Sequence, residues 1–341
     1  AGSSYTASLK LFGLFPVKDV AVKVVDATSV VPCGTPFGIK MFTDGVLVVG
    51  LSAVETDSGP SSPGRTCGLK AGDIITHING QEVNTIEEVQ DILGDEQGDA
   101  MTLRATRNGK PVQLSVQAIQ NTQGSYQLGV WLRDSMAGIG TMTFYDPDSG
   151  VFAALGHGIN DVDTATLMPM ESGSIMYASV TDVKKGESGA PGELHGSFDV
   201  NRDLGDLYAN TNLGIYGVLR DGALSPHGEA VEVAAREEVH VGGATILSNI
   251  AGEQVEEYQV EITHVYPAAA GDTRNLMVQV TDPRLLETTG GIVQGMSGSP
   301  ILQDGKLVGA VTHVLVNDPT RGYGILAKNM VSQCVWEEQA Q

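Results

Sequence analysis

Residues 291–300 read GIVQGMSGSP, and residues 301–312 continue as ILQDGKLVGAVT. Gly295 and Gly298 surround Ser297, and glycine lets a chain turn tightly enough for nearby backbone N–H groups to face one point. Residues 301–312 predict a strand, a tight turn at Asp304-Gly305 and a second strand. The stretch therefore predicts a serine on a glycine turn, beside backbone donors suited to a negatively charged oxygen.

The pattern Gly-x-Ser-Gly-x-Pro resembles the nucleophile turn of chymotrypsin-like peptidases. The same short pattern surrounds Ser188, but the residues after it, GELHG, do not predict a strand, a turn and a strand. The hairpin therefore favours Ser297 as the nucleophile and the amides of Gly295 and Ser297 as the oxyanion donors. The second strand ends in Thr312-His313-Val314, which would offer its edge to a peptide.

A serine nucleophile needs a base. His157 ends a predicted strand in the small-residue stretch AALGHGI at residues 153–159, which loosely resembles the Thr-Ala-Ala-His-Cys context of trypsin-like enzymes. The other six histidines have no such context, although His313 follows the nucleophile hairpin and could line the cleft. His157 is therefore the predicted base.

The residues themselves do not decide which carboxylate would orient this base. Asp282 lies 15 residues before Ser297, since 297 − 282 = 15, and Asp206 lies 49 residues after His157, since 206 − 157 = 49. The second spacing is closer to a trypsin-like layout. Asp161 and Asp163 are nearer still to His157.

A second motif lies in the first half of the chain. Residues 67–80 read CGLKAGDIITHING, and residues 85–93 predict an amphipathic helix with Thr85 as its cap and Glu88 three positions on. The order resembles a PDZ domain of bacterial proteases over residues 33–118. Such a domain adds a peptide to an open sheet edge, and the resemblance places the carboxylate-binding loop at Phe37-Gly38-Ile39. A PDZ fold that only packs against its neighbour is the alternative.

After residue 125, short apolar runs alternate with glycine-rich turns, which predicts a barrel or a sandwich. Only residues 229–238 and 327–336 predict helices there. The expected fold is mainly β, with a PDZ-type α+β domain followed by a chymotrypsin-like β-barrel peptidase domain. The expected boundaries are an N-terminal arm at 1–32, the PDZ domain at 33–120 and the peptidase domain at 121–341.

The composition of the chain excludes several classes of binding partner. The 341 residues include 20 Lys and Arg against 41 Asp and Glu, a formal charge of −21, which argues against nucleic acid and anionic lipid. The chain has three cysteines, Cys33, Cys67 and Cys334, and no C-x-x-C spacing, so we expect no metal site and no disulfide framework. We also expect no small-molecule cofactor. A single Cys33–Cys67 bond stays open. No apolar run reaches membrane-spanning length, and no signal peptide is visible.

Several longer stretches resemble the stage IV sporulation protein B peptidases of endospore-forming Firmicutes. The blocks most specific to that family are residues 138–144 and 290–300. Together the shared stretches span nearly the whole chain: residues 10–13, 17–20, 45–50, 133–144, 154–157, 281–300 and 309–324.

This resemblance implies a signalling serine endopeptidase that is exported and membrane-tethered, acts in the space between forespore and mother-cell membranes, and is represented here by a soluble fragment. It would cleave itself and a membrane-anchored inhibitor of the sigma-K processing complex, and its PDZ domain would bind the substrate or another copy. The implied triad is His157, Asp282 and Ser297, with Thr312 as support, so Asp282 replaces Asp206 as the favoured third member.

Two other functions are compatible with the sequence. One is a PDZ peptide-binding scaffold whose peptidase-like domain is inactive, against which the intact pair of His157 and Ser297 argues. The other is a quality-control protease of the HtrA kind. That kind usually places its PDZ domain after the protease, whereas here the PDZ domain comes first.

Overall fold

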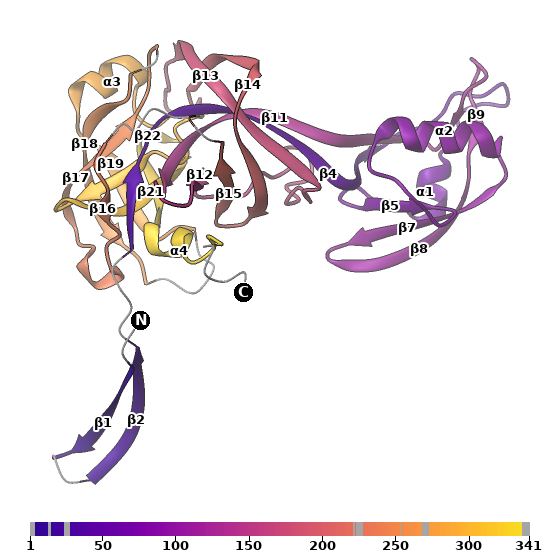
Figure 1. Ribbon diagram of the computed structural model, residues 1–341. Helices are drawn as coiled ribbons and strands as arrows, with labels where there is room; N and C mark the ends of the chain where they lie inside the picture. Colours follow the sequence, from indigo (N-terminus) through magenta and orange to yellow (C-terminus); the bar gives the residue numbers. More distant parts are fainter. Residues whose placement is uncertain are drawn as a thin grey trace.

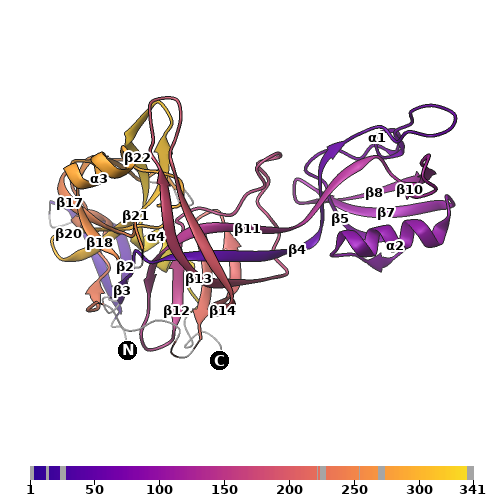
Figure 2. The ribbon, with the colours of Figure 1, turned by 90° about the horizontal axis from the view of Figure 1, so that it is seen from above.

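The computed structural model of the chain describes residues 4–12, 15–23, 28–220, 222, 228–252, 254–267 and 273–335. Three bodies are visible in Figure 1: a β-rich body at the left, a smaller body with helices at the right, and a projecting hairpin of β1 (Ser4–Leu11) and β2 (Phe15–Lys23). Two long strands join the two larger bodies. The same separation is seen from above in Figure 2.

The first barrel is a ring of six antiparallel strands, closed because β4 pairs with β11. Phe37, Phe152 and Ile175 are fully buried inside it. Two short strands, β3 (Ser29–Pro32) and β16 (Val231–Glu232), extend its sheet beyond β11. The ring consists of β4 (Pro36–Leu51), β11 (Val130–Tyr145), β12 (Val151–Ala154), β15 (Gly214–Leu219), β14 (Glu193–Thr211) and β13 (Ser172–Lys184).

The second barrel is closed as well and follows the first in the chain. A separate core of buried aliphatic side chains fills it, including Ile246, Val278 and Ile301. Its strands are β17 (Gly242–Ser248), β18 (Glu256–Val265), β19 (Leu276–Val280), β22 (Asp318–Leu326), β21 (Lys306–Leu315) and β20 (Pro300–Gln303). The accompanying helices are η1 (Arg236–Glu238), α3 (Pro283–Thr289) and α4 (Ala327–Val331). Two such barrels in succession form a chymotrypsin-like domain.

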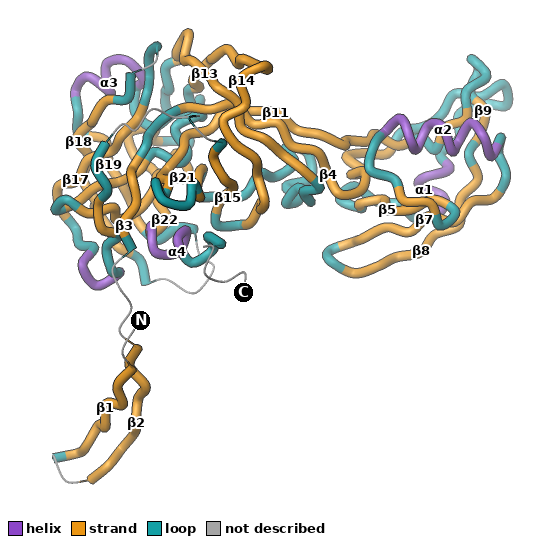
Figure 3. Tube along the Cα trace, in the orientation of Figure 1, coloured by secondary structure: helices purple, strands orange, loops and turns teal. Residues whose placement is uncertain are grey.

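The smaller body has the PDZ arrangement of a helix over a curved sheet (Figure 3). Its main helix begins as predicted. Thr85 Oγ1 accepts a hydrogen bond from the amide of Glu88, and the Glu88 carboxylate accepts one from the amide of Thr85. The elements are α1 (Pro63–Cys67), β5 (Ile74–Ile78), β6 (Gln81–Glu82), α2 (Ile86–Glu96), β7 (Ala100–Arg107), β8 (Lys110–Gln117), β9 (Ile119–Gln120) and β10 (Tyr126–Gln127).

The PDZ body is inserted in the chain between β4 and β11 of the first barrel. β4 starts in the barrel and ends in the PDZ sheet, where Val46 and Leu47 pair with β5, and β11 returns along it with Val130 opposite Leu51 and Thr141 opposite Pro36. The predicted boundary at residue 33 is therefore wrong. Residues 29–42 belong to the first barrel, because β3 and this part of β4 pair with β11 and the side chains of Phe37, Ile39 and Met41 are buried in its core.

Two further expectations change. The predicted helix at residues 229–238 is wrong, because Val231 and Glu232 pair with β3 and only residues 236–238 are helical. The predicted helix at 327–336 ends at Val331, and residue 336 lies outside the described residues. Cys33, Cys67 and Cys334 are all free thiols, so the Cys33–Cys67 bond does not form in this structure.

Candidate active site

The turn that carries Ser297 is fixed by neighbouring backbone. Gly298 has a φ of +99°, and a Cβ on it would collide with Thr141 O, so only glycine fits there. The Gly298 amide donates to Val311 O at 2.8 Å, and the Thr141 amide donates to Ser297 O at 3.1 Å. The glycine turn inferred from the sequence therefore holds a half-buried serine between the two barrels.

Two backbone N–H groups beside Ser297 are oriented by the carbonyls that precede them. Gln294 O accepts from the amide of Leu194 at 2.8 Å, and Met296 O accepts from the amide of Ser299 at 3.0 Å. Because a trans peptide directs C=O and N–H to opposite sides, the amides of Gly295 and Ser297 point away from these partners. Among the hydrogen bonds of the described residues, neither amide donates, so both are available to an oxyanion.

His157 follows β12 after two residues with positive φ, Leu155 and Gly156. Its Nδ1 lies 2.9 Å from Gly158 O, which can only accept, so the proton sits on Nδ1 and Nε2 keeps its lone pair. Burial lowers the pKa of His157 below its ordinary value, against the smaller opposing effect of the Gly158 carbonyl. The ring is therefore neutral at pH 7 and can accept a proton.

His157 and Ser297 line one cavity of about 370 Å³ between the barrels, together with the predicted oxyanion residue Gly295. In this geometry Ser297 Oγ donates to Thr312 O at 2.7 Å. None of the hydrogen bonds of the described residues joins Ser297 to His157. Thr312, predicted as support, acts here through its backbone carbonyl, while its side chain donates to Tyr323 O at 3.2 Å.

Neither candidate for the third triad member reaches His157. Asp282 caps α3, accepts from the amides of Arg284 and Gln259 and pairs with the Arg284 guanidinium, whose hydrogen bonds lower the pKa of this carboxyl to about 2. Asp206 lies on β14 and pairs with Arg220. In this structure neither Asp282 nor Asp206 is the third member of the triad, because each carboxylate pairs with an arginine and not with His157.

The group that orients His157 here is the carbonyl of Gly158, and the side chain that holds this loop is Asn210. Asn210 accepts from the amide of Ile159 at 2.9 Å and donates to Ile159 O and Met168 O at 3.0 and 2.9 Å. A backbone carbonyl leaves no sequence signal. The sequence therefore suggested only carboxylates as the group that orients His157.

A second imidazole lies beside the base. The rings of His313 and His157 are 5.0 Å apart between centroids. Burial, and then the charges of His157 and Arg274, lower the pKa of His313 to about 4. His313 thus lies beside the base and is neutral at physiological pH, but it is not among the residues that line the cavity. The alternative nucleophile Ser188 lies elsewhere, because its hydroxyl donates to Asn317 O.

The predicted PDZ loop at Phe37-Gly38-Ile39 is wrong. These residues pair with β11 along one edge and with β13 along the other, so no free edge is left for a peptide. Ile39 instead lines the catalytic cavity. The apolar-Gly-apolar pattern in this first-barrel strand reflects burial on both sides of the strand.

The PDZ body does carry a groove, of about 930 Å³, between α2 and the start of β11. Residues 130–132 pair with β4 on one edge, and among the described strands none pairs with the other. The groove begins at Leu128-Gly129-Val130, where Gly129 has a φ of +69° and a Cβ would lie 2.6 Å from Ser52 O. This second apolar-Gly-apolar triplet fits the carboxylate-binding loop, and it lies just before the strand edge that a peptide would extend.

Within the described residues, no three potential metal-ligating side chains gather, and no helix is both long and apolar enough to cross a bilayer.

The double barrel, with its serine turn and histidine in one cleft, and the inserted PDZ body define a PDZ-containing serine peptidase of the chymotrypsin-like fold. The family described as SpoIVB peptidase S55 matches residues 124–331, and a PDZ domain family matches residues 56–107. Because the first match covers more than half of the chain, the chain belongs to the SpoIVB peptidase S55 family.

Individual relatives resemble parts of the chain. The periplasmic pH-dependent serine endoprotease DegQ of Escherichia coli is 39% identical over 67 residues, which are 19% of this chain and 15% of DegQ. A PDZ domain of an SdrC-like protein from Listeria monocytogenes is 24% identical over 26% of this chain and 87% of its own, with a TM-score of 0.21. The active form of the Rv3671c protease from M. tuberculosis is 15% identical over 59% and 73% of the two chains, with a TM-score of 0.31.

Proposed function

We propose that the chain hydrolyses peptide bonds as a serine endopeptidase, with Ser297 as nucleophile and His157 as base. One observation carries the proposal: the two side chains line one cavity, with Nε2 of His157 unprotonated and two backbone N–H groups free beside Ser297. This is the set of groups that acyl transfer to a serine requires.

The reaction follows from these positions. Ser297 Oγ leaves Thr312 O and bonds to the carbonyl carbon of the substrate, while its proton passes to His157 Nε2. The carbonyl oxygen becomes negative and is stabilised by the amides of Gly295 and Ser297. His157 then gives the proton to the leaving amine as the C–N bond breaks. Water attacks the acyl-serine, gives a proton to His157 and releases the acid, and Ser297 regains its proton.

An inactive scaffold is the second candidate, and two observations favour it. The Ser297 hydroxyl donates to Thr312 O rather than to His157, and in the part of the chain that the structure describes no carboxylate forms a hydrogen bond with the base. A scaffold would retain this geometry permanently, whereas an enzyme must leave it when substrate binds.

Labelling with a serine-reactive fluorophosphonate separates the two candidates. We expect the wild type to be labelled, Ser297→Ala not at all, and His157→Ala about 10²–10⁴ times more slowly, which is the usual contribution of a general base. Ser188→Ala is the matched control and should label like the wild type, because its exposed hydroxyl lies by Asn317. A wild type that stays unlabelled would favour the scaffold.

We further propose that the enzyme is a sporulation signalling protease, exported and membrane-tethered in the space between forespore and mother-cell membranes. It would cleave itself and a membrane-anchored inhibitor of the sigma-K processing complex, with self-association through the PDZ body. Membership of the SpoIVB peptidase S55 family supports this role. Incubation with the exported segment of that inhibitor tests it: fragments should form with the wild type and not with Ser297→Ala. If a generic peptide is cut while the inhibitor stays intact, the role is wrong and the hydrolase proposal stands.

A further inference from the structure

One wall of the catalytic cavity is a small hairpin that follows His157. Ile159, Asn160 and Val162 line the cavity from this side. A bridge between Asn160 and Leu167 closes the hairpin, and the amide of Asp161 donates to Thr166 O at 2.8 Å. Val162 at its tip is 80% exposed, so packing does not hold the tip in place.

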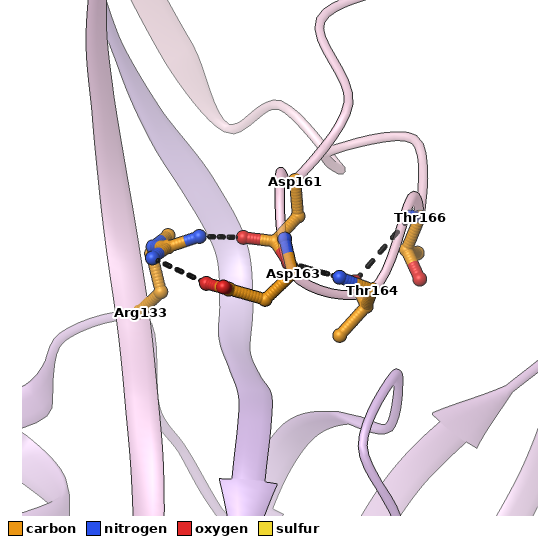
Figure 4. Close-up of polar contacts among 5 residues, drawn as sticks. All are labelled: Arg133, Asp161, Asp163, Thr164 and Thr166. Carbon is orange, nitrogen blue, oxygen red and sulfur yellow. Dashed lines mark hydrogen bonds and ion pairs between the residues drawn. The ribbon is translucent and has the colours of Figure 1, made fainter.

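Asp161 instead organises the hairpin from within. Its side chain is completely buried, and its Oδ1 accepts from the amides of Asp163 and Thr164 and from the Thr164 hydroxyl, at 3.1, 2.8 and 2.8 Å. Its Oδ2 is paired with the Arg133 guanidinium, which also reaches the exposed Asp163 at 2.9 Å (Figure 4). A buried carboxylate needs such a charged partner. The hairpin tip is therefore tied to Arg133.

Arg133 belongs to β11, which also contributes residues 136–139 to the lining of the cavity. The same strand begins at the PDZ groove, three residues before Arg133, and continues to Thr141, whose hydroxyl donates to Gly295 O at 2.7 Å. One strand thus borders the groove, holds the cavity wall and supports the turn of the nucleophile.

The base of the hairpin has an independent support. Asn210 holds Ile159 and Met168 at the two ends of the loop, and Gly158 O holds His157. Loss of Arg133 should therefore release the tip at residues 160–167 and leave the base of the loop in place. This division predicts a defect in substrate binding more than in the chemical step.

We propose that Arg133 is a positioning residue for substrate binding, which holds the 160–167 hairpin through Asp161 as one wall of the catalytic cavity. This inference rests on the proposed peptidase activity. Because the lining contributed by Ile39, Met136, Ile159 and Val162 is apolar, the wall would contact apolar side chains next to the scissile bond.

The test uses the full chain and a short internally quenched peptide with apolar residues on both sides of its scissile bond. We expect Arg133→Met to raise KM by at least about fivefold with a smaller change in kcat, because binding contacts and not the reacting groups are lost. Arg133→Lys should rescue KM in part, since lysine keeps the charge but not the two-pronged geometry. Asp163→Asn is the matched control and should keep the wild-type KM, because Asp163 is the exposed partner.

The rate of fluorophosphonate labelling separates the two proposals, since this small probe needs Ser297 and His157 but little of the wall. Labelling of Arg133→Met at the wild-type rate together with a raised KM supports the inference. A wild-type KM in that variant overturns it and leaves the peptidase proposal intact. Should Arg133→Met not fold, Arg133→Lys replaces it, and a KM equal to that of the wild type then overturns the inference. A wild type that neither labels nor cleaves refutes the peptidase proposal instead.

Discussion

At the residue scale, the neighbour of His157 offers a test of how the base responds to pH. The ring of His313 lies 5.0 Å from that of His157 between centroids, and its own pKa of about 4 keeps it uncharged over most of the pH range. His157 must be neutral to accept a proton, and its pKa is lowered below the ordinary 6.5. The acid limb of activity should therefore lie below pH 6.5.

Two substitutions of His313 should move this limb in opposite directions. His313→Glu adds a negative charge beside the base, favours protonated His157 and moves the limb to higher pH. His313→Lys adds a positive charge beside the base, disfavours protonated His157 and moves the limb to lower pH. Profiles of kcat/KM against pH measure both shifts, and His77→Gln in the PDZ body is the control. Coincident limbs for the two variants would contradict this account.

Local sequence predicts the residues whose requirements are local. The glycine turn around Ser297 was predicted because Gly295 and Gly298 need positive φ, and that need is visible in the residue type. The partners of His157 were not predicted. Gly158 O is backbone, Asn210 is an ordinary amide, and both candidate carboxylates are occupied by arginines that no spacing rule reveals.

At the element scale, α3 depends on Asp282. The carboxylate caps the helix and binds Arg284, and α3 ends at Thr289 with Gly290 as its C-cap, directly before the turn of the nucleophile. We expect Asp282→Ala to lower the free energy of unfolding by about 1 kcal/mol, and Asp282→Asn by less, because asparagine also caps helices. Asp206→Asn should have little effect, since its ion pair with Arg220 is exposed. Peptide cleavage should follow the same order, with Asp282→Asn below Asp206→Asn.

The effect of Asp282 should also depend on pH. Its pKa is lowered to about 2 in the folded chain by hydrogen bonds from Arg284, whereas the pKa of an aspartate in an unfolded chain is about 3.9. The carboxylate therefore stabilises the fold above about pH 4 and loses this contribution as pH falls toward 2. Denaturant titrations at neutral and acidic pH measure it. A gap between the wild type and Asp282→Ala that is as large near pH 2 as at pH 7 would show that the charge is irrelevant.

Helices and strands whose apolar residues recur at a clear spacing were predicted well. Those whose structure depends on pairing with residues far away in the sequence were not. The amphipathic helix predicted at residues 85–93 matches α2, and the strand, turn and strand predicted at residues 301–312 match β20 and β21. The helix predicted at residues 229–238 failed because pairing with β3 and a bond from the Ala234 amide to Leu307 O override its local preference. The long strands β13 and β14 were missed, since many of their side chains face solvent and alternate weakly.

At the scale of the whole molecule, the order of the modules was predicted and their connection was not. The sequence suggested one domain after another, but β4 and β11 each run through both (Figure 2). Their pairing joins residues about a hundred positions apart, as in Pro36 and Thr141, and no local pattern reports such a partner. As a result the loop Phe37-Gly38-Ile39 was assigned to the wrong body.

We expect a peptide to bind at the start of β11, and Trp131 is the side chain that tests this position. Trp131 lines the groove and is 65% exposed, so its loss should not unfold the PDZ body. A buried aromatic contact with a peptide contributes about 1 kcal/mol, so Trp131→Ser should weaken binding of peptides selected on the full chain by about fivefold without changing the melting temperature. Val218→Ser, an exposed apolar residue on β15, is the control. Isothermal titration measures both affinities, and equal values for the two variants would place the peptide elsewhere than along this strand.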